Sequence, residues 1–286
     1  HAAGVPVVQT VHNYRQVCAN GLFFRDGHIC TDCSGRAFAT PAIAHACYRG
    51  SRAQSAVMAT TLAVHRPTWR SVELYLALTE AIATHLRGYG IPAERIVVKP
   101  NSVPDPGPPD PLGDGFVLLS RLVPEKGVDL LLQAWQRHPD GSLGRLRVVG
   151  DGPLRPEVEQ AAATRADVTF LGQQDRAGVR QALRESAVVL VPSRWHDVLP
   201  TVILEALAAG RPVLGSDLGG IPYLVDRAGW VVPATVDAFA AALPRAQAEA
   251  AALAPVARQR YLDAFHPDVV LRRHLAIYDE VRTARH

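Results

Sequence analysis

The chain has 286 residues, enough for two modest domains, and its 48% hydrophobic and 20% charged residues are ordinary for a soluble globular protein. Its longest apolar runs, such as residues 187–191, are far too short to cross a bilayer. The sequence has no basic run interleaved with aromatic residues, which excludes the usual nucleic-acid modules. We see no signal peptide at the start and therefore expect a cytoplasmic protein.

The net charge of +3 is small but unevenly distributed. Residues 1–99 hold ten Lys/Arg and five Asp/Glu, a balance of +5, so the remainder sums to −2. A basic first part predicts contact with anionic lipid or an acidic acceptor, and the alternative is an ordinary solvated surface. Basic residues are almost all arginine, with only Lys99 and Lys126 as lysines.

The first elements in chain order are a helix end at His1–Gly4 and a strand at 5–11. The sequence pattern of residues 2–10 recurs at 208–216. This similarity indicates either two halves of similar α/β construction or only the glycine and proline that commonly occur between a helix and a strand. A domain would not normally begin at a helix end. We therefore expect that the first domain is incomplete and lacks its opening strands.

An α/β rhythm is clear from residue 73 onward. We expect a strand at 74–78, a helix capped by Thr79 that ends near residue 88 or 90, and a strand at 96–98. Residues 100–115 contain six prolines and three glycines, which is typical of an interdomain linker.

The second half alternates strictly between strands and helices. The expected strands are 116–120, 145–149, 168–171, 187–191, 212–215 and 230–232; the expected helices are 127–138, 153–165, 176–186, 201–209, 219–226 and 235–252. Short apolar strands between helices predict a parallel sheet covered on both faces, with ligands at the carboxyl ends of its strands. A final amphipathic helix is expected at 268–284.

Two strand-to-helix turns carry groups suited to phosphate. Arg121 and Lys126 follow the strand at 116–120, and two cations beside helix amino termini suit a diphosphate. The alternative is that Arg121 pairs with a helix carboxylate and Lys126 is solvated. Gly150 and Gly152 follow the next strand and would let a flat ligand approach the backbone, although a plain tight turn also explains them.

The segment from Pro192 to Gly210 carries the strongest pattern. Leu199, Pro200 and Thr201 form a helix start whose exposed amides favour an anion. Glu205 is an acid within an apolar helix face, so it needs a partner such as paired ribose hydroxyls, or alternatively Arg211. Asp197 lies on the loop before the helix, where it would either contact a sugar ring or cap the helix.

These motifs resemble glycosyltransferase family 4, the retaining enzymes with the GT-B fold. The elements Arg-Leu-x-Pro-Glu-Lys-Gly, Gly-Asp-Gly-Pro, acid-x7-Glu and Asp-Leu-Gly-Gly-Ile-Pro occur in the family's order between Val5 and Val232. The resemblance implies that Arg121 and Lys126 hold the donor diphosphate and that Glu205 binds the ribose. It also implies that the acid at position 197 contacts the donor sugar. Thr10-Val-His12-Asn looks like the family's histidine loop, so His12 is expected to face donor sugar and acceptor; otherwise it is an ordinary strand-end histidine.

Two departures from the family pattern stand out. Asp197 and Val198 replace the usual Glu and Gly, and the family's glycine-rich acceptor loop is missing. The family mechanism implies retention with no metal at the diphosphate, in agreement with the lack of an Asp-x-Asp motif. Arg121, Lys126 and helix amides would then stabilise the charge on the leaving diphosphate, an oxygen of which would take the acceptor's proton.

Four cysteines, Cys18, Cys30, Cys33 and Cys47, lie within thirty residues, and no others exist. The spacing of Cys30 and Cys33 is that of a zinc knuckle, which favours a structural zinc over disulfides in a cytoplasmic chain. Reduced buried thiols are the alternative. No neighbouring base would activate these thiols for catalysis.

We therefore expect an α/β protein of GT-B type, with two Rossmann-like domains and parallel sheets. Its parts would be an acceptor-side domain at 1–105 with a four-cysteine insertion at 18–47, a donor domain at 106–267, and a terminal helix at 268–286 that packs back on the first domain. The expected activity is sugar transfer from a nucleoside-diphosphate sugar to a saccharide or lipid-linked acceptor at the inner membrane face. A sugar-nucleotide epimerase and a non-catalytic nucleotide-sugar-binding subunit are the alternatives.

Overall fold

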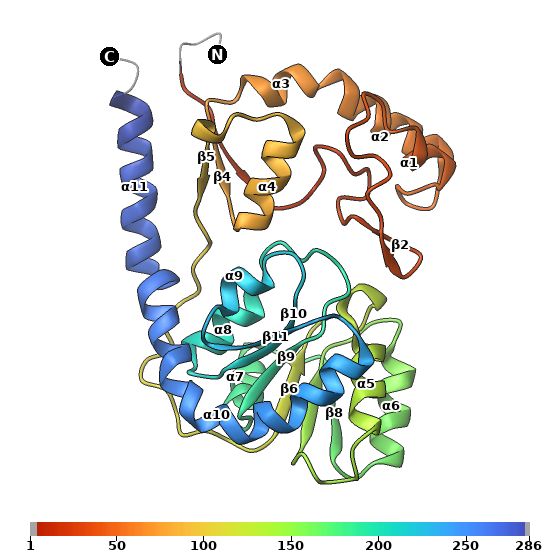
Figure 1. The fold of residues 1–286 in the computed structure, drawn as a ribbon, viewed down its shortest axis with the longest axis vertical. Helices are drawn as coiled ribbons and strands as arrows, with labels where there is room; N and C mark the ends of the chain where they lie inside the picture. The colour runs from red at the N-terminus through yellow and green to blue at the C-terminus, as the bar shows by residue number, and fades with distance from the viewer. Residues whose placement is uncertain (1–4, 284–286) are drawn as a thin grey trace. The chain divides into compact units, whose positions relative to one another are not determined.

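The computed structural model describes residues 5–283, and they form two compact units (Figure 1). The first unit holds residues 5–101, 195–199 and the stretch from residue 270; the second holds 102–194 and 200–269. The helix end expected at His1–Gly4 lies outside the described residues. The domain boundaries expected at residues 105 and 267 stay a prediction.

The second unit is built on a six-stranded sheet in the order β11-β10-β9-β6-β7-β8, with every strand pair parallel. Its strands are β6 (Phe116–Leu119), β7 (Leu146–Val149), β8 (Val168–Gly172), β9 (Val188–Val191), β10 (Val213–Ser216) and β11 (Gly229–Val232). All residues of β6 and β9 are buried, as their unbroken apolar runs predict for central parallel strands. The expected α/β class with parallel sheets is confirmed.

Helices follow the strands in strict alternation. They are α5 (Val128–Gln136), α6 (Arg155–Thr164), α7 (Arg176–Arg184), α8 (Thr201–Ala208), α9 (Ile221–Val225) and α10 (Val236–Ala264). The apolar faces of α5 and α10 meet the sheet in one core, where the rings of Trp135 and Phe116 pack edge to face at 5.5 Å. The indole of Trp135 donates to the buried Asp167, so this core carries a satisfied polar contact.

Helix α10 is longer than the 235–252 expected from the sequence, because it continues through Pro255 to Ala264, and it also contains Pro244. A proline inside a helix leaves the carbonyl four residues earlier without its donor. For Pro244 that carbonyl belongs to Ala240, and the Nε2 atom of His138 lies 2.9 Å from it. A side chain from a neighbouring helix end thus replaces the lost bond, which a local sequence pattern does not reveal.

The first unit contains a three-stranded parallel sheet, β1 (Val8–Val11), β4 (Leu74–Ala77) and β5 (Ile96–Val98), in the order β1-β4-β5. Helix α4 (Glu80–Tyr89) buries Ile82 and Leu86 in the core of this unit. Thr79 is the N-cap residue of α4, as the sequence predicts. Its hydroxyl makes no capping bond and instead donates to the carbonyl oxygen of Val198 at 3.1 Å.

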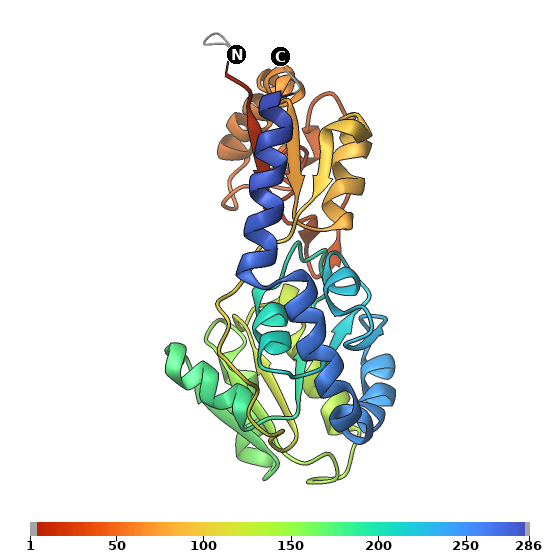
Figure 2. The ribbon, with the colours of Figure 1, turned by 90° about the vertical axis from the view of Figure 1, so that its left-hand side faces the viewer.

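Residues 12–73 hold elements that the sequence analysis did not assign. They are α1 (Thr40–Ala44), α2 (Arg52–Val64), α3 (Arg66–Ser71) and a hairpin of β2 (Phe24–Arg25) with β3 (His28–Ile29). The last helix, α11 (Pro267–Thr283), is long and straight in Figure 2, and its Tyr278 and Val281 share a shallow hollow with Val8 of β1.

Candidate functional site

Three loops interlock at the carboxyl edge of the six-stranded sheet, after the adjacent strands β9, β6 and β7. The amide of Leu122 donates to the carbonyl of Asp151 at 2.8 Å, and the amide of Arg194 donates to the carbonyl of Glu125 at 2.9 Å. The Arg194 guanidinium also pairs with Asp129 on α5 at 2.9 Å. The loop at 120–127 is therefore held from both sides by its neighbours.

Glycine is required where these loops cross. A Cβ on Gly127 would lie 1.9 Å from the carbonyl oxygen of Pro192, and a Cβ on Gly150 would lie 1.8 Å from that of Ser120. A Cβ on Gly152 would lie 2.5 Å from the carbonyl oxygen of Leu122. The glycines after β7 thus serve close packing of loop against loop, beyond the plain tight turn.

We expect the change Gly127→Ala to destabilise the second unit more than Gly141→Ala does. Both glycines have positive φ, +69° and +77°, so each alanine costs about 1–2 kcal/mol in backbone strain. Only Gly127 faces an atom within 4 Å, and the resulting overlap adds about 1–3 kcal/mol. Urea unfolding of the two variants checks this, and equal losses would contradict the interlocked loops.

Two cations stand on the loop after β6. Lys126 closes the short 3-10 helix Pro124–Lys126 and is half-buried, and Gly127 with φ +69° turns the chain into α5. The side chain of Arg121 is 67% exposed and lies 3.6 Å from Glu125. The pairing of Arg121 with a helix carboxylate, weighed above, is therefore present, but an exposed pair of this kind is worth only about 0–1 kcal/mol and leaves the guanidinium available to a ligand.

Glu205 lies on α8 in the same unit, half-buried, and burial raises the pKa of its carboxyl. No side-chain hydrogen bond to Glu205 occurs among residues 5–283. The alternative partner Arg211 is turned away, because its guanidinium donates to six backbone carbonyls, those of Asp110, Pro111, Leu183, Arg184, Ser186 and Ala209. A half-buried carboxylate that has no hydrogen-bond partner in this part of the chain, and only the more distant charge of Arg176 acting on it, suits a ligand with hydroxyl groups.

The helix start before Glu205 has the expected form. Pro200 is the N-cap of α8 and Thr201 is its first residue, exposed to solvent. The first amides of a helix have no partner within it, so they point at whatever binds in front of α8. Leu199 precedes them and packs on the core of the first unit.

Asp197 and His12 belong to the first unit. Asp197 is 5% exposed, and its amide donates to the carbonyl of Trp195 at 2.8 Å. Because Pro200 is the N-cap, the capping alternative for Asp197 is wrong. Burial, with a smaller contribution from the charge of Asp197, raises the pKa of Tyr14. His12 is exposed at the end of β1.

The expected zinc site is not supported. Within the described range, no three His, Cys, Asp or Glu side chains are placed to hold a metal ion together. The four cysteines are free and half-buried, and Cys18 donates to the Asn20 side chain at 2.9 Å. Burial raises the pKa of Cys33 to about 11 and also raises that of Cys47. The reduced-thiol alternative therefore fits this structure.

Comparison with protein-family models matches both halves of the chain. Residues 1–102 match the model described as "Glycosyl transferase 4-like domain", and residues 113–248 match "Glycosyl transferases group 1". The chain belongs to the GT-B glycosyltransferases of family 4. The second match includes the loops after β6, β7 and β9 described above.

Two curated relatives of this family-4 chain are bacterial proteins of polysaccharide synthesis by name. An exopolysaccharide phosphotransferase of Streptomyces coelicolor is 28% identical over 75% of the chain and 24% of its own length. WcaL of Escherichia coli, named for colanic acid biosynthesis, is 30% identical over 73% of the chain and 57% of its own length. The chain therefore spans about a quarter to just over half of these two relatives.

Solved structures share the GT-B fold of the chain. HepE of Anabaena in complex with UDP has a TM-score of 0.69 at 19% identity, covering 98% of this chain and 73% of that one. Sucrose-phosphate synthase of Thermosynechococcus elongatus has a TM-score of 0.67 at 21% identity, covering 85% and 66%. At such identities the likeness establishes the fold.

Some contributors to this candidate site were not singled out from the sequence. Arg194, to which we gave no role, ties the loop after β9 to Asp129, and Glu125 faces Arg121. Gly127 was not named as a site residue, although a glycine between a short turn and a helix start is a signal for positive φ. Sequence position alone does not show which charged neighbours of a motif meet.

Proposed function

We propose that the chain transfers a sugar, with retention, from a nucleoside-diphosphate sugar to a saccharide or lipid-linked acceptor in polysaccharide or glycoconjugate synthesis. The observation that carries this is the loop edge of the second unit, where an exposed Arg121, Lys126 and an unpaired Glu205 stand on loops and a helix that follow neighbouring parallel strands. Ligands of open parallel sheets bind at this edge.

In the proposed complex, Arg121, Lys126 and the first amides of α8 hold the diphosphate, and Glu205 accepts hydrogen bonds from two ribose hydroxyls. Gly150 and Gly152, whose Cβ positions are filled by the loop after β6, hold their turn against that loop so that its backbone contacts the nucleotide. Asp197 and His12 contact the donor sugar. No metal ion is needed at the diphosphate in this proposal, because the cations and amides offset its charge.

The proposed reaction breaks the bond between the anomeric carbon and the diphosphate oxygen. The acceptor oxygen forms its bond to that carbon from the same face, and its proton passes to a diphosphate oxygen. Charge grows on the leaving diphosphate as the bond breaks, so Arg121 and Lys126 stabilise the transition state more than the ground state. The anomeric configuration of the product, read by NMR, tests retention.

No helix in the described range has the length and apolar character needed to span a bilayer. We propose that the reaction takes place in the cytoplasm at the inner membrane face. The balance of +5 over residues 1–99 supports peripheral contact with anionic lipid. Pelleting with vesicles of phosphatidylserine, at low and high salt, tests this contact.

A thermal-shift screen of UDP-, GDP-, ADP- and dTDP-sugars tests donor binding, because a ligand that binds only the folded state raises Tm. UDP-sugars are the first probes, since the Anabaena neighbour holds UDP. We expect one nucleotide series to raise Tm. A chain that binds none of the four would not be this enzyme, and conversion of the donor without acceptor would indicate an epimerase.

A substitution of Glu205 tests whether this residue binds the nucleoside part of the donor rather than the diphosphate. We expect Glu205→Ala to weaken nucleoside-diphosphate binding by about 1.5–3 kcal/mol, the range for hydrogen bonds to a charged group, and to leave binding of inorganic diphosphate unchanged. Titration calorimetry with UDP and with diphosphate measures both. Glu159→Ala, on the surface of α6, is the matched control. If Glu205→Ala weakened the binding of UDP and of diphosphate equally, Glu205 would not be the residue that binds the ribose.

A further inference from the structure

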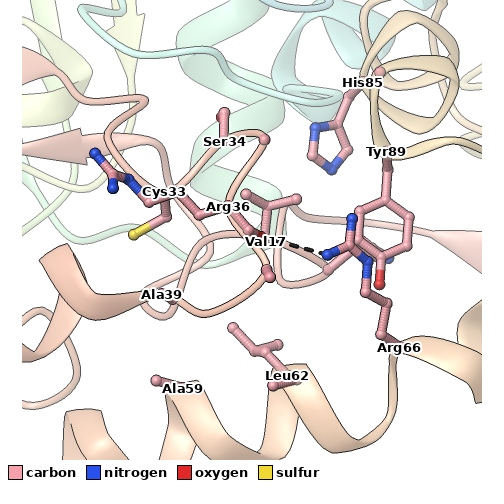
Figure 3. A pocket seen from close by; sticks show the side chains of 15 residues that line it. Val17, Cys33, Ser34, Arg36, Ala39, Ala59, Leu62, Arg66, His85 and Tyr89 are labelled. Atoms are coloured by element: carbon pink, nitrogen blue, oxygen red, sulfur yellow. Dashed lines mark hydrogen bonds between the residues drawn. The ribbon is translucent and has the colours of Figure 1, made fainter.

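A polar pocket lies wholly within the first unit, apart from every residue assigned above to the donor or to the reaction (Figure 3). It opens among the turn at 16–17, the segment 33–39, the end of α2, the start of α3 and the end of α4. Its volume is about 170 Å³, whereas one water needs only about 10–15 Å³. The pocket therefore has room for a small molecule or for one unit of a larger one.

Four side chains that line the pocket carry buried polar atoms with no hydrogen-bond partner: Oε1 of Gln16, Nε of Arg66, Nε2 of His85 and the hydroxyl of Tyr89. Gln16 and Tyr89 are each only 7% exposed. An unpaired polar atom at such a position destabilises the fold, because it has lost its hydrogen bonds to water and has gained none in the protein. Four of them round one hollow indicate a ligand that supplies the missing partners.

The charged residues that line the pocket are all basic. The Arg66 guanidinium borders the pocket, the Arg36 guanidinium turns away to the carbonyl of Asp32, and none of the lining residues is an aspartate or glutamate. Within residues 5–283 Arg66 has no carboxylate partner; its Nη1 donates to the carbonyl of Arg36 at 3.4 Å, the dashed line in Figure 3. A guanidinium with a free Nε edge is suited to an anion.

The Arg66 guanidinium is fixed by stacking, with its carbon 5.4 Å from the centre of the Tyr89 ring. His85 stands on the same helix as Tyr89, and its ring meets Tyr14 and Phe23 edge-on at 5.1 and 5.3 Å. Burial lowers the pKa of His85 to about 4, so the ring is neutral near pH 7. A neutral imidazole, an amide and a phenol together suit hydroxyl groups.

We propose that this pocket binds an anionic sugar unit, whose carboxylate or phosphate lies on Arg66 and whose hydroxyls meet Gln16, His85 and Tyr89. As a part of the acceptor, such a unit makes the acceptor of the proposed transfer an acidic saccharide, and this acceptor role rests on the proposed function. Binding of the sugar unit itself does not, because the pocket contains none of the donor residues.

Titration calorimetry on the full chain tests the pocket, with glucuronate and glucose 6-phosphate as probes and glucose as the uncharged control. We expect saturable binding of at least one anionic sugar and at least tenfold weaker binding of glucose. Tighter binding of glucuronate would show that Arg66 holds a carboxylate, and tighter binding of glucose 6-phosphate would show that it holds a phosphate. No saturation by either at about 10 mM, far above a Kd of about 1 mM, would overturn the proposal, as would equal binding of glucose.

Two variants locate the binding. We expect Arg66→Met to weaken binding of the anionic sugar at least tenfold. We expect Tyr89→Phe, which keeps the stacked ring, to weaken it at least threefold. Arg70→Met removes an arginine of α3 that does not line the pocket and should change binding less than twofold. If Arg66→Met and Tyr89→Phe both bind like Arg70→Met, the pocket is not the site. UDP binding, measured in parallel, is expected to be equal in all three variants, so failure here leaves the donor site untouched.

Discussion

The changes Lys126→Ala and Arg121→Ala are each expected to lower kcat/KM for sugar transfer by about 100- to 1000-fold. That is the range for removing one preorganised group from a developing anion, because water does not replace a fixed cation at the moment of bond breaking. Ground-state binding is expected to suffer less, by about 1–3 kcal/mol for UDP. Kinetics with a saturating acceptor and calorimetry with UDP separate the two effects.

Arg245→Ala is a closely matched control for Arg121→Ala. The Arg245 side chain is 68% exposed and pairs with Glu249 at i,i+4, whereas that of Arg121 is 67% exposed and pairs with Glu125 at i,i+4. Loss of an exposed pair is worth about 0–1 kcal/mol in stability at either place. Only the Arg121 change should affect the reaction. If both arginines can be removed with the same small effect, the diphosphate does not lie on the loop after β6.

Arg211→Met is expected to cause the largest loss of stability among the substitutions considered, about 3–5 kcal/mol, with a fall in Tm on the order of 10 °C. Arg211 is 1% exposed, and its guanidinium donates to six carbonyls at 2.8–3.1 Å. Two of those carbonyls, of Asp110 and Pro111, belong to the proline-rich segment that precedes β6. Methionine fills a similar volume but leaves all six acceptors without this donor.

The control for Arg211 is Arg184→Met. The Arg184 side chain is 52% exposed and lies 4.0 Å from Asp110, so its removal should change the free energy of unfolding by about 0.5 kcal/mol or less. Urea unfolding measures both variants. A similar small loss for Arg211→Met would mean that water or a rearranged backbone satisfies the six carbonyls.

The sheet of the second unit could be predicted closely because its strands are short apolar runs between helices. Strand β9 was expected at 187–191 and occupies Val188–Val191, and β6 was expected at 116–120 and occupies Phe116–Leu119. Local periodicity specifies such elements. Helix α10 could not be predicted in full, since it continues through Pro255, a residue that normally interrupts a helix, and ends only at Ala264.

The helices at 40–71 were missed because their sequence carries little helical periodicity. Helix α2 buries only Ser55 and Ala59, so small residues rather than a stripe of large apolar ones form its inner face. The pocket beside it joins Gln16, Arg66 and Tyr89 from three separate segments. No local sequence pattern predicts that these three segments come together, because their contact depends on tertiary packing.

Motif spacing indicated the donor residues, but the choice between partners needed coordinates. Glu205 had two candidate partners in the sequence, a ribose and Arg211, and the carbonyl contacts of Arg211 exclude the second. For Asp197, the position of the N-cap at Pro200 excludes capping. The four cysteines do line one small hollow, as their closeness in sequence suggests, but no three metal-ligand side chains in the described part of the chain are placed to hold an ion, so the spacing of Cys30 and Cys33 was misleading.

A crystal structure of the chain with UDP tests the central claim most directly. We expect the diphosphate within hydrogen-bond distance of Arg121 and Lys126, at the amino end of α8, and both ribose hydroxyls on the carboxylate of Glu205. A nucleotide bound elsewhere, or a diphosphate held at this edge with the ribose turned away from Glu205, would contradict the account.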